Sequence, residues 1–206
     1  LFLAFSKAAL AQFGNCTASE MRTYVDSATG NTITMLTDTM KNDRFLYQTD
    51  PMWTADGKYL LFRSSSRGND KEVESTLPNG EKRKWTPTQI YFIEMATGKI
   101  IQATEGPNLG SAFLANKTNR MFVSRKEKEN RNMYVMDLNK FFADVKQGKV
   151  GKPSAYETFI GTFPTEMGRP GGYAVDCNDD YAYITVEREG TEEEKERMMK
   201  NAFLPE

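Results

Sequence analysis

A hairpin pattern that recurs at intervals of about 60 residues constrains this chain more than any other feature. An aromatic residue leads into a short polar turn, and alternating strand-forming residues follow. The three copies lie at Trp53–Phe62, Phe113–Phe122 and Tyr173–Tyr183. The first turn is Asp56-Gly57, which suits a hairpin because glycine accepts a positive φ and aspartate bonds to its own backbone. Asn116 takes the place of Asp56 in the second copy, and three copies at a steady interval indicate a repeat architecture.

A second hairpin pattern, built around Thr-Gly, alternates with the first. Its first copy, residues 23–37, contains Ala28-Thr29-Gly30, and alternating residues follow the turn. Its second copy, residues 90–104, carries the same triplet at Ala96-Thr97-Gly98. A third copy, from Met133, is stretched by an insertion. Together the two patterns predict a repeating unit of four short strands.

Four short strands per repeat are typical of a β-propeller blade. We therefore expect an all-β fold, a β-propeller fragment of about three four-stranded blades with loop and helix insertions. The expected blade units are residues 23–106, 107–166 and 167–206, the last one incomplete. Propeller repeats usually span about 40–45 residues, so the longer interval indicates insertions. These are a polar stretch at 68–85, a helix-like stretch at 139–151, and a helix that a capping box opens at Thr191 and that runs to about Ala202.

Three blades cannot close a ring without leaving a hydrophobic flank and a bare sheet edge. We therefore expect residues 12–206 to be an incomplete propeller domain. Residues 1–11 are mostly apolar and end in Ala9-Leu10-Ala11, which is typical of the end of a signal peptide and predicts a periplasmic or secreted protein. An amphipathic N-terminal helix is the alternative interpretation, and Lys7 favours it by interrupting the apolar run. No apolar run approaches the about 20 residues that span a membrane.

Composition excludes several classes of site. The net charge is −1, which indicates no nucleic-acid partner. The chain has no histidine, so the commonest general base and metal ligand are missing from it. Cys16 and Cys177 have no metal-site or redox spacing, and nothing in the sequence supports a disulfide between them. We expect neither catalytic residues nor metal ligands in this stretch.

Cationic and aromatic residues at strand ends, with the amide of Gln48 beside them, are the candidate substrate-binding residues, because these positions would face a propeller channel. They are Arg44, Tyr47, Gln48, Arg63, Arg67, Arg125 and Arg169. Arginine binds carboxylates with a planar two-pronged geometry, and aromatic rings stack on sugar faces, so their convergence would suit an acidic saccharide. The alternative is that these arginines pair with acidic loop residues or are solvated.

Over roughly residues 22–190 the chain resembles the opening blades of the oligogalacturonate lyases. The segments that carry the resemblance are Tyr24–Thr37 around the Thr-Gly turn, Asn42–Gln48, Thr54–Phe62 around Asp-Gly-Lys, and Thr104–Gly106. The resemblance implies a seven-bladed propeller that degrades pectin by cleaving short oligogalacturonides through β-elimination, with a divalent metal such as manganese. A cation beside the uronate carboxylate stabilises the charge that develops as a base removes the C5 proton.

The resemblance also implies that the base and the metal ligands, mostly histidines with a glutamine, lie in later blades. Asn42 stands where these lyases commonly carry a histidine. The Asp-Gly-Lys and Thr-Gly turns also occur in Tol-system-like propellers. A non-catalytic propeller that binds protein or peptide partners at an apolar channel mouth is therefore the second hypothesis. A propeller attached to a separate hydrolase or peptidase domain is the third, and the sequence gives no indication of oligomeric state.

Overall fold

The computed structural model describes residues 13–48, 50–68, 72–76, 80–128, 130–163, 169–187 and 193. The predicted leader lies outside these residues, and so does the predicted C-terminal helix except for Glu193. The all-β prediction is confirmed, since the described chain consists mainly of antiparallel sheets with the helix α1 inserted in one of them. No described helix has the length and apolar character needed to cross a membrane.

The first sheet is buried on both faces. Its strands, in spatial order, are β1 (Cys16–Thr17), β9 (Ile100–Gln102), β8 (Gln89–Glu94), β5 (Tyr59–Ser64) and β4 (Asp43–Arg44). Successive residues of a strand point to opposite faces. Leu61 and Phe92 therefore enter one apolar cluster, whereas Phe62 and Ile93 enter another on the opposite face. This two-sided burial explains why β5 and β8 read as continuous apolar runs.

The second sheet is a meander interrupted by a helix. It runs in chain order through β10 (Leu109–Leu114), β11 (Arg120–Glu127), β12 (Asn130–Asp137) and β13 (Glu157–Thr162). The helix α1 (Leu138–Gln147) and the short 3₁₀ helix η1 (Pro153–Ala155) separate the last two strands. Asp137 caps α1 by accepting a bond from the Lys140 amide, and Gly148 ends it at a φ of 66°. The predicted helical insertion is therefore confirmed.

The main core lies where the first sheet, the second sheet and α1 meet. The ring of Phe142 stacks on Tyr59 at 3.7 Å and meets Phe92 edge-on at 5.1 Å. Phe141 packs against Phe13 with ring centroids 5.0 Å apart. The helix inserted in the second sheet thus packs on the first sheet through aromatic contacts, which favour stacked and edge-on geometries.

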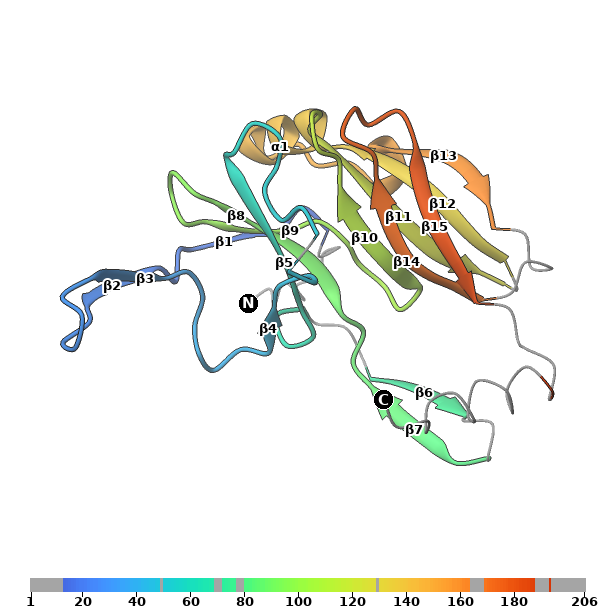
Figure 1. Ribbon diagram of the computed structural model, residues 1–206, viewed down its shortest axis with the longest axis horizontal. Coiled ribbons are helices and arrows are strands. Elements are labelled where there is room, and N and C mark those ends of the chain that lie inside the picture. The colour runs from blue at the N-terminus through green and yellow to red at the C-terminus, as the bar shows by residue number, and fades with distance from the viewer. Residues whose placement is uncertain are drawn as a thin grey trace, which may run out of the picture.

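A third pair of strands follows the second sheet. β14 (Arg169–Val175) and β15 (Ala182–Glu187) lie beside β10 and β11 in Figure 1. Phe113 of β10 stacks on Tyr173 of β14 at 5.6 Å, and Ile184 joins the same apolar cluster. Sheets that follow one another along the chain and pack in this way are the arrangement of propeller blades.

Hydrogen bonds confirm the first repeat and correct its alignment. The same backbone bond, 3.0 Å long, closes each of the three turns. It joins the amide nitrogens of Thr54, Ala115 and Asp176 to the carbonyl oxygens of Tyr59, Arg120 and Tyr181, respectively. Because these bonds align Thr54 with Ala115, Asn116 is not the counterpart of Asp56, and the sequence alignment is wrong by one residue there.

The Thr-Gly repeat is also confirmed, but its first copy stands apart from the first sheet. β2 (Arg22–Val25) and β3 (Thr32–Met35) form a separate hairpin that projects at the left of Figure 1. Gly30 has a φ of 71° and its amide donates to Asp26, as Gly98, at 69°, donates to Glu94 between β8 and β9. The predicted unit 23–106 is therefore not a single sheet.

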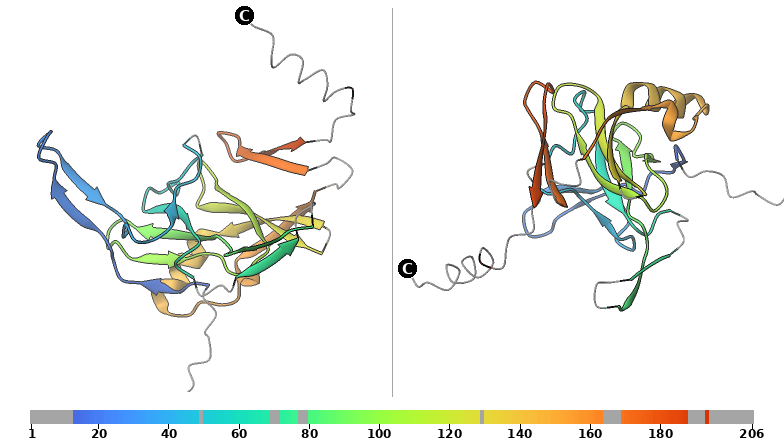
Figure 2. Two further views of the ribbon diagram at one scale, coloured as in Figure 1. Left: turned by 90° about the horizontal axis from the view of Figure 1, so that it is seen from below. Right: turned by 90° about the vertical axis from the view of Figure 1, so that its right-hand side faces the viewer.

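A second projecting hairpin occupies the polar insertion predicted at 68–85. Its strands are β6 (Val73–Thr76) and β7 (Lys82–Trp85), and Figures 1 and 2 show it extending away from the sheets. Its residues are almost all exposed. The polar insertion therefore lies outside the apolar core.

Candidate functional site

A pocket of about 810 Å³ lies where the edge strands of successive sheets meet. β4 ends the first sheet and β10 ends the second, and both line the pocket together with Tyr173 of β14. A propeller has its central channel at the inner edges of its blades. The volume falls within the range of about 300–1,000 Å³ that is typical of small-molecule sites.

Two arginines on adjacent strands dominate the charge of the pocket. Arg44 of β4 and Arg63 of β5 are directly opposite one another in the strand register, and both line the pocket. Cβ atoms of such pairs are about 4.5–5.5 Å apart, and like charges placed there repel. Among the described residues, no carboxylate forms an ion pair with either guanidinium. The pair is therefore a site of uncompensated positive charge.

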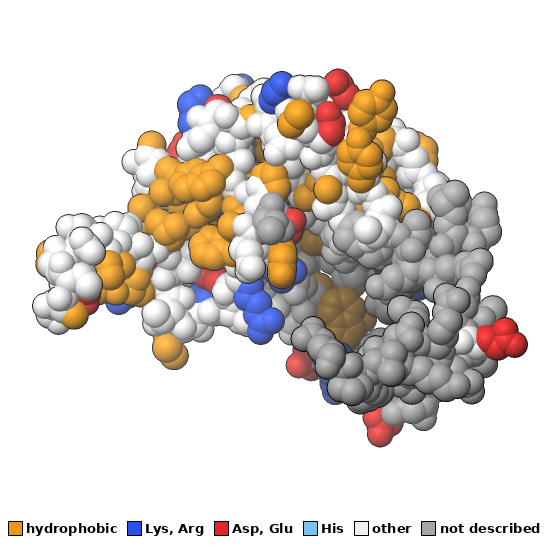
Figure 3. Space-filling model, viewed as in Figure 1, with side chains coloured by type: hydrophobic (Ala, Val, Ile, Leu, Met, Phe, Trp, Pro, Cys, Tyr) orange, Lys and Arg blue, Asp and Glu red, His pale blue; other side chains and the backbone are white. Residues whose placement is uncertain are grey.

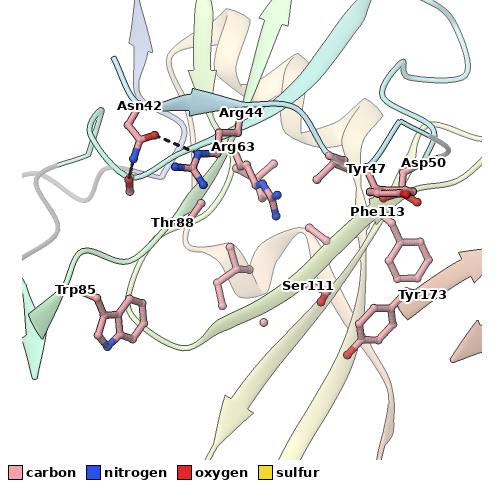
Figure 4. Close-up of a pocket in the computed structure, with 16 residues that line it drawn as sticks. Asn42, Arg44, Tyr47, Asp50, Arg63, Trp85, Thr88, Ser111, Phe113 and Tyr173 are labelled. Carbon is pink, nitrogen blue, oxygen red and sulfur yellow. Dashed lines mark hydrogen bonds between the residues drawn. The ribbon is translucent and has the colours of Figure 1, made fainter. Parts of the chain in front are cut away.

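Asn42 holds Arg44 in the pocket. Its side-chain oxygen accepts a bond from Nε of Arg44 at 3.2 Å, and its nitrogen donates to Oγ of Ser65 at 2.8 Å. Its backbone amide donates to Oγ of Ser66 at 2.8 Å. Figure 4 shows the first two bonds as dashed lines. The residue that departs from the lyase pattern thus orients an arginine in this chain.

Aromatic rings and polar groups line the pocket beside the two arginines. Tyr47, Trp85, Phe113 and Tyr173 contribute rings, which Figure 4 shows spaced around the opening. The polar groups come from Asp50, Ser65, Thr88 and Ser111. In Figure 3, exposed Lys and Arg side chains near the middle of the face lie beside hydrophobic ones. A sugar ring presents apolar faces and hydroxyl edges, and this lining offers partners for both.

Arg67 has a structural role instead of the predicted binding role. Its guanidinium donates four bonds, of 2.6–2.9 Å, to the carboxylates of Glu20 and Asp43, and its side chain is only 6% exposed. Burial alone would lower the pKa of Arg67, but these two carboxylates outweigh it and raise the pKa further. The hydrogen bond from Arg67 lowers the pKa of Glu20 to about 2. Four of the five N–H donors of Arg67 are therefore already used within the protein.

Arg125 is likewise paired within the protein. Nε and Nη2 of Arg125 both donate to the Glu157 carboxylate, which joins β11 to β13 across the second sheet. Gln48 is exposed and does not line the pocket. Arg169 lies in β14, and its side chain is outside the described part of the chain. Of the seven predicted residues, the pocket therefore brings together Arg44, Tyr47 and Arg63.

Several residues of the pocket were missed by the sequence analysis. Trp85 lies in the polar insertion predicted at 68–85, and Ser111 lies in the middle of β10. Phe113 and Tyr173 were recognised only as markers of the repeat. The recurrence of aromatic residues gave no direct signal, because the turn bonds align Trp53 with Leu114 and Val175 and not with Phe113 and Tyr173.

The residues of the pocket do not fit a divalent metal. Asp50 supplies a carboxylate, but within the described ranges no group of three or more Asp, Glu, Cys or His side chains lies close enough to hold an ion. Cys16 and Cys177 are both free and exposed, so no disulfide joins them.

Comparison with solved structures finds similar proteins, among them two structures of oligogalacturonate lyases. One is an oligogalacturonate lyase in complex with manganese, with 20% identity and a TM-score of 0.54. The other is an oligogalacturonate lyase from Vibrio parahaemolyticus, with 21% identity and a TM-score of 0.55. The matches cover 82% and 81% of this chain but 36% and 35% of those proteins.

These matches confirm the resemblance at the level of the fold, which is that of part of a lyase-like propeller. The chain spans about a third of the length of the two lyases. No model of a known protein family matches the chain. No curated protein matches it either.

Proposed function

We propose that this chain is the part of a uronide-cleaving lyase that binds the carboxylates of a short oligogalacturonide. The observation that carries the proposal is the cross-strand pair Arg44–Arg63, which faces the pocket and forms no ion pair with a carboxylate among the described residues. Placing two like charges opposite one another is unfavourable unless an anion neutralises them. A guanidinium pairs with a carboxylate through two parallel hydrogen bonds.

The chemistry of uronate β-elimination agrees with this arrangement. The C5 proton becomes easier to remove when positive charge stabilises the carboxylate next to it, because negative charge spreads onto that group. Arg44 and Arg63 would hold the carboxylate, and Tyr47 and Trp85 would contact the faces of the sugar rings. In this proposal the base and the manganese site belong to other parts of the full lyase. In this proposal the chain meets pectin fragments in the periplasm or outside the cell, which agrees with the signal peptide predicted at residues 1–11.

A propeller that binds proteins remains the second hypothesis. Its channel mouth should be apolar, whereas the pocket of this chain carries Arg44, Arg63 and Asp50. Peptides with acidic side chains could still bind there. The test therefore needs a ligand pair that differs only in the carboxylates.

Calorimetric titration of the chain with digalacturonate and with uncharged galactobiose provides that pair. The proposal predicts that digalacturonate binds and that its affinity falls as salt is added, because salt screens exposed charges. Galactobiose should bind at least about tenfold more weakly, the scale of a lost hydrogen bond to a charged group. Equal affinity for both sugars, or binding of neither, would refute the proposal.

A further inference from the structure

The projecting hairpin of β6 and β7 has two chemically different faces. Its register places Val73 opposite Trp85 and Ser75 opposite Arg83. Directly opposite residues share a face and neighbours along a strand alternate. Arg83 and Trp85 therefore lie on one face of the hairpin with Ser75 and Val73 opposite them.

The other face of the hairpin carries two lysines and one carboxylate. Lys84 is opposite Glu74, and the ammonium group of Lys82 lies 2.7 Å from the Glu74 carboxylate. On the face of Trp85, neither cross-strand neighbour is acidic. Among the described residues, no carboxylate forms an ion pair with Arg83. The two faces thus differ in that a carboxylate lies among the cations of the Lys84 face, whereas Arg83 has a serine opposite it.

Trp85 lies both on the hairpin face of Arg83 and in the wall of the pocket. Its ring lines the same cavity as Arg44 and Arg63, and Figure 4 shows it at the side away from Phe113 and Tyr173. Arg83 precedes it by two residues, so its Cα lies about 7 Å farther out along β7. Trp85 therefore lies between Arg83 on the hairpin and the pocket that Arg44 and Arg63 line.

We propose that Arg83 and Trp85 form an outer subsite that receives the next uronate residue of a longer oligogalacturonide. Arg83 pairs with the carboxylate of that residue, and the indole of Trp85 covers a face of the sugar that connects it to the pocket. The subsite rests on the proposed function, since it extends the site of Arg44 and Arg63. It makes the hairpin a determinant of ligand length.

Titration with a short and a longer ligand tests the subsite. Digalacturonate and tetragalacturonate would be titrated into wild type, Arg83→Gln and the opposite-face control Lys84→Gln at physiological salt. Wild type should bind the tetramer more tightly than the dimer. Arg83→Gln should weaken tetramer binding by about threefold to fivefold, the scale of an exposed charge pair, and leave dimer binding unchanged. Lys84→Gln should change neither.

The outcomes separate the two proposals. If wild type binds both ligands and Arg83→Gln binds the tetramer as wild type does, the subsite is refuted while the pocket stands. The same holds if Arg83→Gln and Lys84→Gln weaken tetramer binding equally, because general charge would then explain the loss. If wild type binds neither ligand, the proposed function fails and the subsite fails with it. Arg83 is exposed, so the variant retains the fold.

Discussion

Arg63 and Arg67 lie close together in the sequence, but their surroundings give them opposite roles. Arg63 is exposed at the pocket, opposite Arg44. Arg67 lies between Glu20 and Asp43 and stacks over the ring of Phe62 at 5.3 Å. A charged residue at the end of a strand thus becomes a ligand-binding group or a structural one according to which carboxylates the fold brings to it.

Replacing each of these two arginines by glutamine should separate stability from binding. Arg67→Gln leaves two partly buried carboxylates without a cation, and we expect it to lower the free energy of unfolding by about 3 kcal/mol. Arg63→Gln removes an exposed charge and should change it by less than about 0.5 kcal/mol. Urea unfolding measures both values. Equal losses in the two variants would contradict the roles assigned to them.

Acid should weaken the contact between Glu20 and Arg67. The pKa of Glu20 is about 2 in the folded chain against an ordinary value of 4.5, mainly because of the hydrogen bond from Arg67. A lowered carboxyl pKa adds stability above the unfolded value, and this stability is lost as the pH falls through the folded one. The difference in unfolding free energy between wild type and Arg67→Gln should therefore shrink between about pH 4.5 and pH 2. A constant difference would rule out this linkage.

At the scale of elements, the two Thr-Gly turns have the same local structure but different surroundings. Gly30 and Gly98 both close Thr-Gly turns with φ near +70°. A Cβ on Gly30 would meet nothing within 4 Å, whereas one on Gly98 would overlap Oγ of Ser19 and lie 2.6 Å from Sδ of Met21. The chain before β2 thus packs on the second turn and leaves the first one open.

Alanine at each of these glycines measures that difference. Gly30→Ala should cost about 1 kcal/mol, the penalty for a side chain in the left-handed region. Gly98→Ala should cost at least about 1 kcal/mol more, because Ser19 and Met21 must move. Denaturant unfolding of both variants provides the comparison. Similar losses would show that the packing on Gly98 adds nothing.

Local signals explain which elements could be predicted from the sequence. The turn at Gly57, the Thr-Gly turns and the capped helix α1 are encoded by residues close together in the chain. β1 pairs with β9 across more than 80 residues, and no local pattern contains that information. The two-residue strand β4 was missed because its pairing with the end of β5 follows from the fold. Matching residue types also misaligned Asn116 by one position.

The same reasoning applies to the candidate site. The sequence identified the arginines, but it could not distinguish Arg63 from Arg125. Glu157, which neutralises Arg125, lies 32 residues away in the chain. The role of the pocket residue Trp85 could not be predicted, because it lies in a polar insertion. Long-range pairing therefore decided which predicted residues remain available to a ligand.

At the scale of the whole molecule, one carboxylate links the second and third repeats. Asp179, in the turn between β14 and β15, accepts bonds from the backbone amides of Asn116, Lys117 and Thr118 and from the Thr118 hydroxyl. The residue is only 8% exposed. Burial alone would raise the pKa of Asp179, but these bonds outweigh it and lower the pKa. This contact connects consecutive blades through their turns.

Replacing Asp179 by asparagine should weaken the contact between the second and third repeats. Asp179→Asn keeps the shape and tolerates the residue's φ of 64°, but its amide nitrogen cannot accept hydrogen bonds. We expect faster hydrogen exchange at the amides of Asn116, Lys117 and Thr118, and a loss of about 2 kcal/mol in unfolding free energy. The exposed neighbour Asp180, changed to asparagine, serves as the control. Unchanged exchange at all three amides would contradict the linking role.

The central claim is that Arg44 and Arg63 together bind the carboxylate of a uronide at the meeting point of the blades. Its most direct test is calorimetric titration of digalacturonate into wild type and into the double variant Arg44→Gln/Arg63→Gln. We predict that the double variant unfolds at the same denaturant concentration as wild type and binds at least about tenfold more weakly, as loss of a charged hydrogen-bond donor implies. A stable double variant that binds digalacturonate with wild-type affinity would contradict the claim.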